Sequence, residues 1–287
     1  MSQVKAKITK RKVRNVKARR DVKKKRAKKL RDRKNNHFGL MNFRELLGSI
    51  NHPLQGREQY IEIHDELVAR RVDILDFCES EPKGSLLRLN NYSLALTQVY
   101  LHRAYSLYIG AFQALAGNNI YLMTLSIRGF LEAVAGMGYL MSRVNSFKNG
   151  NISAEDLDNS LMVLLLGTKD EKIIDQDGSE IYSAKNVMSM LDAADKVFNS
   201  KVMNNQVPDR KMLRTTYEWL CEFCHPNFNS ASLSYRLDKE NQTLVFNHQN
   251  TTVTERESEL IQNVFIGSYA LIHMHDQTVV IADSLKP

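Results

Sequence analysis

The chain has 287 residues, of which 43% are hydrophobic, and these are enough to bury one large core or two small ones. Its three cysteines are too few for a disulfide scaffold, and its first residues lack the apolar core of a signal peptide. The net charge of +8 combines two unlike parts, because residues 1–34 hold 18 Lys and Arg against two Asp, whereas the rest holds 22 against 30 Asp and Glu. We therefore predict a cytoplasmic protein with a basic arm at residues 1–36 and a mildly acidic domain at 38–287.

The basic arm predicts contact with a polyanion. Repulsion among its cations should leave it disordered, or loosely helical, when no partner is bound. Neutralised phosphates release counterions, so binding would weaken steeply with salt and show little sequence preference. A solubilising or targeting tail is the alternative interpretation. The residues expected to contact nucleic acid, RNA more than DNA, are Lys10, Arg11, Lys12, Arg14, Arg19, Arg20, Lys23, Lys24, Lys25, Arg26, Lys28 and Lys29.

Apolar residues recur at helical spacing along the rest of the chain, and Pro, Gly and Asn separate the periodic stretches. A tight turn at 117–119 (Gly-Asn-Asn) should join the two longest helices into an antiparallel hairpin at about 85–146. The fold class is therefore mainly α, a multi-helix bundle around this hairpin. The expected helices span about 38–50, 57–79, 85–116, 120–144, 153–166, 184–198, 208–224 and 254–281.

Local signals mark the ends of several of these elements. Ser153 is placed to cap the helix that follows it, and Pro208 suits the first turn of a later helix, which the sequence His225-Pro226-Asn227 should end. Residues 254–257 match a capping box, and residues 168–182 read as a polar surface loop. Alternation of apolar and polar residues about a polar turn predicts one small β-hairpin at about 232–247.

The run from Ile120 to Val144 is the most apolar of the chain, yet it carries Arg128 and Glu132 near its middle. An arginine at the centre of a bilayer costs about 3 kcal/mol even on the lenient insertion scale, so we expect a buried helix of a soluble protein and no membrane span. Because the two charged residues are four apart, they share one face of this helix.

Two interpretations of this pair stay open. Together with Tyr105, Tyr108 and His102 of the preceding helix, Arg128 and Glu132 would form the floor of a pocket for a charged ligand. Alternatively, they form a buried, fully hydrogen-bonded ion pair that fixes how the helix hairpin packs.

The sequence Cys221-Glu-Phe-Cys224-His225 also has several interpretations. It matches the pattern of covalent haem attachment, and its thiols and imidazole would suit zinc if Cys78 or His273 supplied a fourth ligand. Small cysteines on an amphipathic helix are more often ordinary core residues, so we expect neither a metal nor a cofactor. His273 and His275 are two apart on their helix and therefore do not predict a shared site with Asp276.

The helix hairpin that bears RGFLE (128–132), with the later helix that ends in YEWLCEFCHPN (217–227), resembles helical bacterial proteins of the HEPN superfamily over residues 85–228. The resemblance implies a metal-independent ribonuclease of a defence or toxin system. HEPN nucleases carry an arginine a few residues before the catalytic histidine, whereas here the nearest upstream arginine is Arg214, eleven residues before His225.

Only His225 therefore matches the family's pattern, and the role of its arginine would pass to Arg128. In such chemistry the imidazole moves a proton and the guanidinium stabilises charge on phosphorus. The candidate catalytic residues are His225, Arg128 and Glu132. The other two interpretations are a nucleic-acid-binding protein without catalysis and a scaffold, or a homodimer formed through the 85–146 hairpin.

Overall fold

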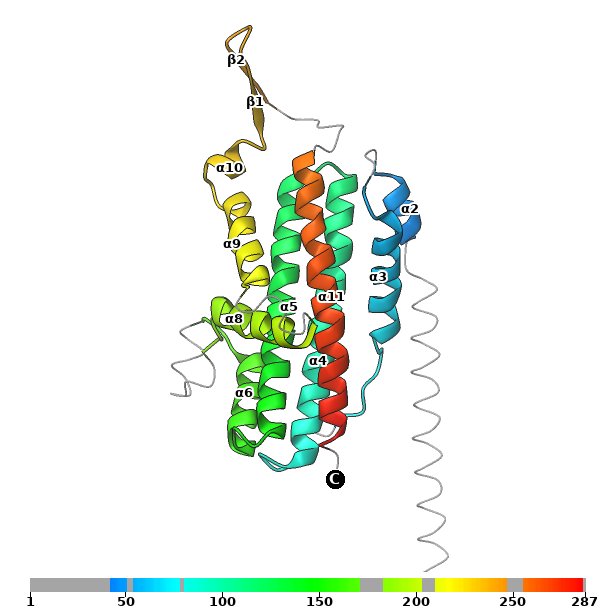
Figure 1. Ribbon diagram of the computed structural model, residues 1–287, viewed down its shortest axis with the longest axis vertical. Helices are drawn as coiled ribbons and strands as arrows, with labels where there is room; N and C mark the ends of the chain where they lie inside the picture. Colours follow the sequence, from blue (N-terminus) through cyan, green and yellow to red (C-terminus); the bar gives the residue numbers. More distant parts are fainter. Residues whose placement is uncertain are drawn as a thin grey trace, which may run out of the picture. The chain divides into compact units, whose positions relative to one another are not determined.

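The computed structural model describes residues 42–50, 54–77, 80–170, 183–202, 210–246 and 255–285. The elements described below belong to one compact unit, Phe43–Pro287 (Figure 1). The basic arm at 1–36 and its twelve candidate phosphate contacts lie outside the described residues. The helices are α2 (Phe43–Gly48), α3 (Arg57–Arg70), α4 (Leu86–Ala116), α5 (Ile120–Lys148), α6 (Ala154–Leu166), α8 (Val187–Val197), a π-helix (Phe198–Val202), α9 (Met212–Cys224), α10 (Phe228–Ala231) and α11 (Glu255–Asp283).

The predicted hairpin of two long helices is confirmed as α4 and α5. The hydroxyl of Ser85 accepts a hydrogen bond from the backbone N–H of Arg88 and so caps the start of α4. In the turn, Asn118 has φ 56°, a left-handed conformation that asparagine tolerates better than most residues. The side chain of Asn119 then caps α5 by accepting from the N–H of Leu122. The mainly α fold class is confirmed as well.

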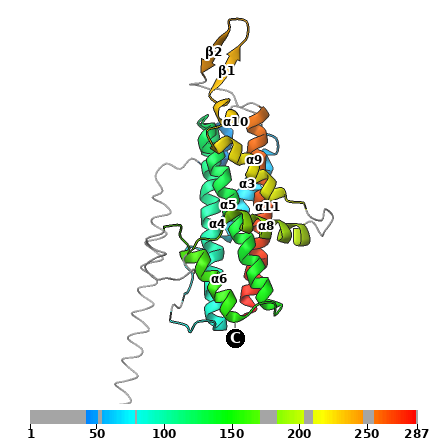
Figure 2. The ribbon, with the colours of Figure 1, turned by 90° about the vertical axis from the view of Figure 1, so that its left-hand side faces the viewer.

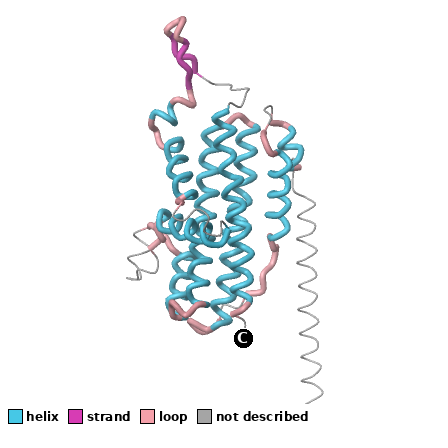
Figure 3. Tube along the Cα trace, viewed as in Figure 1, coloured by secondary structure: helices cyan, strands magenta, loops and turns pink. Residues whose placement is uncertain are grey.

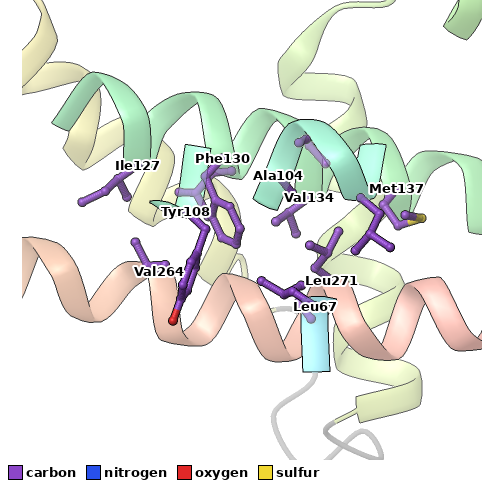
Figure 4. Packing of buried hydrophobic residues seen from close by; sticks show 14 of the residues in the cluster. Leu67, Ala104, Tyr108, Ile127, Phe130, Val134, Met137, Val264 and Leu271 are labelled. Atoms are coloured by element: carbon purple, nitrogen blue, oxygen red, sulfur yellow. The ribbon is translucent and has the colours of Figure 1, made fainter. Parts of the chain in front are cut away.

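The helix α5 lies at the centre of this unit, and its turns from Phe130 to Val144 are enclosed on nearly every side. It packs against α4, α6, α8, α9 and α11. Every residue from Ala133 to Gly138 is buried, so the helix has no apolar stripe facing a single partner. Figure 4 shows Phe130 and Val134 of α5 among side chains of α3, α4 and α11. Burial of each such large side chain stabilises the fold by about 1.5–3 kcal/mol.

By length and composition alone, α5 is also the one helix among the described residues that could cross a membrane. In the protein, however, 67% of its most apolar window is buried by other helices. The core helix of a soluble protein passes the same test of length and hydropathy. The expectation that this chain has no membrane span therefore stays a prediction.

Three helices, α6, α8 and α9, follow one another along one side of α5 in two views at right angles (Figures 1 and 2). A cap at Ser153 with Asp156 begins α6, as predicted. The next helix begins at Val187 rather than at 184, because the side chain of Asn186 caps it, and it continues into the π-helix. The segment 171–182, most of the predicted loop, lies outside the described residues.

The start of α9 differs from the prediction. It begins at Met212 and not near Pro208, which lies outside the described residues. The buried carboxylate of Asp195 on α8 accepts the backbone N–H groups of Leu213 and Arg214 at 2.8 and 3.1 Å, and so caps α9 from another helix. Burial raises the pKa of Asp195, although these two hydrogen bonds oppose the shift. Pro226 ends the helix as predicted, with His225 in an extended conformation.

The prediction for α3 is wrong at its end, because the helix stops at Arg70 rather than near residue 79. Side chains of α4 bind the backbone there and hold it extended. Gln98 donates to the carbonyl of Arg70 and accepts from the N–H of Val72, and His102 lies 3.2 Å from the carbonyl of Val72. These tertiary contacts override the apolar periodicity of residues 71–77.

The predicted β-hairpin is confirmed. Strands β1 (Tyr235–Asp238) and β2 (Thr243–Phe246) pair antiparallel, with Tyr235 opposite Phe246 and Asp238 opposite Thr243. The side chain of Asp238 binds the backbone of the turn at Glu240 and Asn241. In Figure 3 these strands extend beyond the ends of the helices, and the short helix α10 connects them to α9.

A polar network connects α3, near the start of the domain in sequence, with α4 and with α11, its last helix. Arg70 makes a bidentate ion pair with Asp276, at 2.8 and 2.7 Å, and the imidazole Nδ1 of His275 lies 2.9 Å from the same carboxylate. His275 is buried, with Gln98 3.4 Å from its other ring nitrogen. Burial lowers the pKa of His275, and the charge of Arg70 adds to that effect, although Asp276 opposes it.

A close approach of backbones sets the position of α8 on α5. A Cβ atom on Gly138 would lie 2.4 Å from Cβ and 2.6 Å from Cα of Ala194. Only glycine therefore lets the two helices come this close.

The buried imidazole of His275 predicts an acid-sensitive fold. Because its pKa is lower in the folded state, the unfolded chain binds more protons below about pH 6.5, and the free energy of unfolding should fall as pH is lowered from about 7.5 to about 5.5. The loss is about 1.4 kcal/mol for each unit by which folding lowers the pKa. Urea unfolding at several pH values checks this. The variant His275→Gln should show a flatter pH dependence, and an unchanged dependence would contradict the assignment.

Substitution of Gly138 tests the approach of α8 to α5. We expect Gly138→Ala to lower the free energy of unfolding by about 1–3 kcal/mol, since the helices must move apart. The matched control is Gly48→Ala at the end of α2, where an added Cβ meets nothing within 4 Å and should change stability by less than about 1 kcal/mol. Chemical denaturation of both variants makes the comparison. Equal losses of unfolding free energy would show that the contact at Ala194 does not set the distance between α8 and α5.

Candidate functional site

A cleft of about 540 Å³ opens beside α5 at the level of Arg128 and Glu132. Residues of α4, α6, α8 and α9 line it together with the segments that flank 171–182. Its charged lining residues are Arg103, Arg128, Glu132, Lys169 and Lys185, and the tyrosines Tyr100 and Tyr217 form part of its wall. Lining residues on α6, α8 and α9 place the cleft on the side of α5 that these helices cover.

The hydroxyl of Tyr217 on α9 links the two charged residues of α5. It accepts hydrogen bonds from Nε and Nη2 of Arg128, at 3.2 and 3.0 Å, and donates to Oε1 of Glu132 at 3.2 Å. The direct ion pair is longer, with Nε of Arg128 3.6 Å from Oε1 of Glu132. On the other carboxylate oxygen, Glu132 receives Nη2 of Arg103 from α4 at 3.4 Å. The cluster therefore joins three helices.

The surroundings of Arg128, Tyr217 and Tyr100 keep these three side chains in their ordinary charge states. Burial works against the charge of Arg128, but the hydrogen bond to Tyr217 and the charge of Glu132 outweigh it and raise its pKa. Burial raises the pKa of Tyr217, opposed by Arg128, and it raises the pKa of Tyr100 to about 12. At neutral pH both phenols thus stay protonated, and the guanidinium stays cationic.

The pair is only half-buried, which contradicts the burial assumed in the interpretation of Arg128 and Glu132 as a buried, fully hydrogen-bonded ion pair. The side chains of Arg128 and Glu132 are 28% and 30% exposed. Their exposure to the cleft agrees instead with the expectation of a pocket floor for a charged ligand. The partners that complete the floor are, however, different from those predicted.

Tyr105, Tyr108 and His102 face α3 and the chain that follows it, away from the cleft. The hydroxyl of Tyr108 donates to the carbonyl of Tyr60 at 2.6 Å, and that of Tyr105 lies 3.3 Å from Nε2 of His64. On α4 these residues lie on a face turned well away from that of Arg103, since successive helical residues are rotated by about 100°. Tyr100 and Arg103, one turn apart, face α5 in their place.

His225 is exposed at the end of α9 and does not line the cleft. Its backbone N–H closes the helix by donating to the carbonyl of Cys221 at 3.0 Å. No hydrogen bond joins its imidazole to a residue that the structure describes. Of the three candidate catalytic residues, the structure therefore brings Arg128 and Glu132 together, and places His225 outside their cleft.

Cys221 and Cys224 are half-buried free thiols on the face of α9 that turns toward Arg128. Burial raises the pKa of both thiols, although the charge of Arg128 opposes this. Within the described part of the chain, no three His, Cys, Asp or Glu side chains are grouped so as to hold a metal ion. Cys78 lies outside that part, and His273 lies on α11.

No family model matches this chain, and no match was found among curated proteins or among solved structures. The resemblance to HEPN proteins therefore remains a prediction from RGFLE and YEWLCEFCHPN alone. What the cleft binds has to be argued from its own residues.

Sequence reasoning did not find Tyr217, Arg103, Lys169 or Lys185. A signal was available for Tyr217, because it lies one turn before Cys221 on the predicted apolar face and its hydroxyl needs a polar partner there. Arg103 and Tyr100 are three residues apart and therefore lie on the same face of the predicted helix at 85–116. The two lysines flank a polar stretch and carry no signal in the sequence.

The hydroxyl of Tyr217 gives a direct test of the cluster. We expect Tyr217→Phe to lower the free energy of unfolding by about 1 kcal/mol, because Arg128 and Glu132 lose their shared partner in a half-buried site. Tyr235→Phe is the matched control, since its hydroxyl has no hydrogen bond to a described residue and should change stability little. Chemical denaturation compares the two variants. Losses that agree within the error of the method would contradict the bridging role.

Proposed function

We propose that this protein binds nucleic acid, RNA in particular, through the phosphate backbone, with the basic residues of 10–29 as the contacts. The observation that carries the proposal is the division of charge along the chain. The first 34 residues hold 18 Lys and Arg against two Asp, a net charge of +16. Such a concentration of cations attracts a polyanion without sequence preference.

The arginines of the helical domain support this assignment, because many of them are paired with carboxylates of the same domain. Arg88 binds the buried Asp158 at 2.8 Å, and Arg214 binds Asp192 at 2.7 Å. Arg70 is held by Asp276 in the same way. Cations neutralised within the fold contribute little to phosphate binding, whereas two aspartates cannot neutralise the arm.

The other functional interpretations stay predictions. A ribonuclease would need the imidazole of His225 and the guanidinium of Arg128 to reach one phosphate, and the cleft that Arg128 lines does not include His225. A scaffold or a homodimer formed through α4 and α5 would need a free face of that hairpin. No specific contact among the described residues favours either of them over nucleic-acid binding.

Neutralisation of the arm tests the proposal. Replacing by Gln, in the full chain, the twelve Lys and Arg residues that we expect to contact nucleic acid should weaken binding to a single-stranded RNA by at least about a hundredfold at low salt, since many phosphate contacts are lost. Fluorescence anisotropy over a salt series checks this. The logarithm of the binding constant of the unchanged chain should fall linearly with the logarithm of salt concentration, and the slope should be much smaller in the variant.

The matched control keeps the composition of residues 10–29 and scrambles their order. Electrostatic binding to phosphates should survive scrambling, whereas a sequence-specific contact or a folded arm should not. If the neutralised chain binds RNA as tightly as the unchanged one, the arm is not the contact and the proposal is wrong.

A further inference from the structure

We propose that the cleft beside α5 is a binding site for a small organic phosphate, a phosphomonoester whose organic part is about the size of one ring. The phosphate would lie among Arg103, Lys169 and Lys185, with Arg128 behind them, and the ring would lie against the wall that Tyr100 and Met190 form. The proposal is independent of nucleic-acid binding by the arm, which lies elsewhere in the chain.

Among the described residues that line the cleft, the charges are unbalanced. Four cationic side chains, those of Arg103, Arg128, Lys169 and Lys185, line it with one carboxylate, that of Glu132. Both oxygens of this carboxylate are already used, one by Tyr217 and the other by Arg103. Gathering this excess of positive charge costs free energy through repulsion. An anion with two negative charges would relieve the repulsion, and a phosphomonoester carries −1.5 to −2 at neutral pH.

The backbone holds the two lysines near one another. Thr168 and Ser183 form an isolated parallel bridge, and the N–H of Ala184 donates to the carbonyl of Thr168 at 2.9 Å. Lys169 and Lys185 therefore extend from two adjacent segments that are fixed together. The ammonium group of Lys185 lies 5.4 Å from the ring centroid of Tyr139, a cation–π contact, and no carboxylate of a described residue pairs with either lysine.

The size and the wall of the cleft indicate a ligand larger than an inorganic ion. Its volume of about 540 Å³ lies within the range of sites for small organic molecules, and phosphate alone would leave most of it empty. The ring of Tyr100 is held in place at this wall, since Gly136 leaves room for it and a Cβ there would lie 2.3 Å from its Cε1. Val163 and Met190 add apolar surface.

Phenyl phosphate is a suitable probe, because it combines a dianionic phosphate with one ring. We expect the full chain to bind one equivalent in isothermal titration calorimetry, more tightly than it binds inorganic phosphate, which lacks the ring, or benzyl alcohol, which lacks the charge. The double variant Lys169→Gln, Lys185→Gln should weaken the binding of phenyl phosphate at least about tenfold, since hydrogen bonds to charged groups are lost.

The matched control is the double variant Lys196→Gln, Lys239→Gln, which removes the same charge from exposed positions that do not line the cleft. It should bind phenyl phosphate as the unchanged chain does. Equal weakening in both double variants, or binding that needs no ring, would overturn the site and reveal only a general attraction to positive charge. Since the arm is intact in both variants, the affinity for RNA should not change in either, and the two proposals can therefore fail separately.

Discussion

Enclosure of α5 from Phe130 to Val144 is the constraint on which the rest of the structure depends. A helix that is apolar all round has to be covered by several partners, and α4, α11, α6, α8 and α9 share that task. A charged pair in the middle of such a helix is not covered in the same way, because the free energy of desolvating its charges would exceed the free energy gained by packing. At Arg128 and Glu132 the cover is therefore incomplete, and a polar cleft takes its place.

A chain of contacts leads from that constraint to the geometry of the cleft. Gly138 lets α8 approach α5 at Ala194, and the next residue of α8, Asp195, caps the start of α9. The capped helix then carries Tyr217 to the position between Arg128 and Glu132. One close backbone contact thus fixes the hydroxyl that organises the cluster. Packing and polar contacts are coupled here, and neither alone explains where the cleft lies.

The parts of the fold that could be predicted from the sequence are those that local chemistry determines. The turn at Asn118, the cap at Ser153 and the stop at Pro226 all depend on residues close in sequence, and the structure has each of them. The end of α3 and the start of α9 depend on side chains from other helices, Gln98 and Asp195, which periodicity cannot reveal. For the same reason the sequence located Arg128 and Glu132 but supplied the wrong partners from α4, and the lysines of the cleft were not found.

The most direct test of this account is a crystal structure of the full chain with phenyl phosphate. The account predicts phosphate oxygens within about 3 Å of the ammonium groups of Lys169 and Lys185, with the phenyl ring against Tyr100 and the hydroxyl of Tyr217 still between Arg128 and Glu132. A phosphate bound at another surface, or a cleft that is filled by side chains of the protein itself, would contradict it.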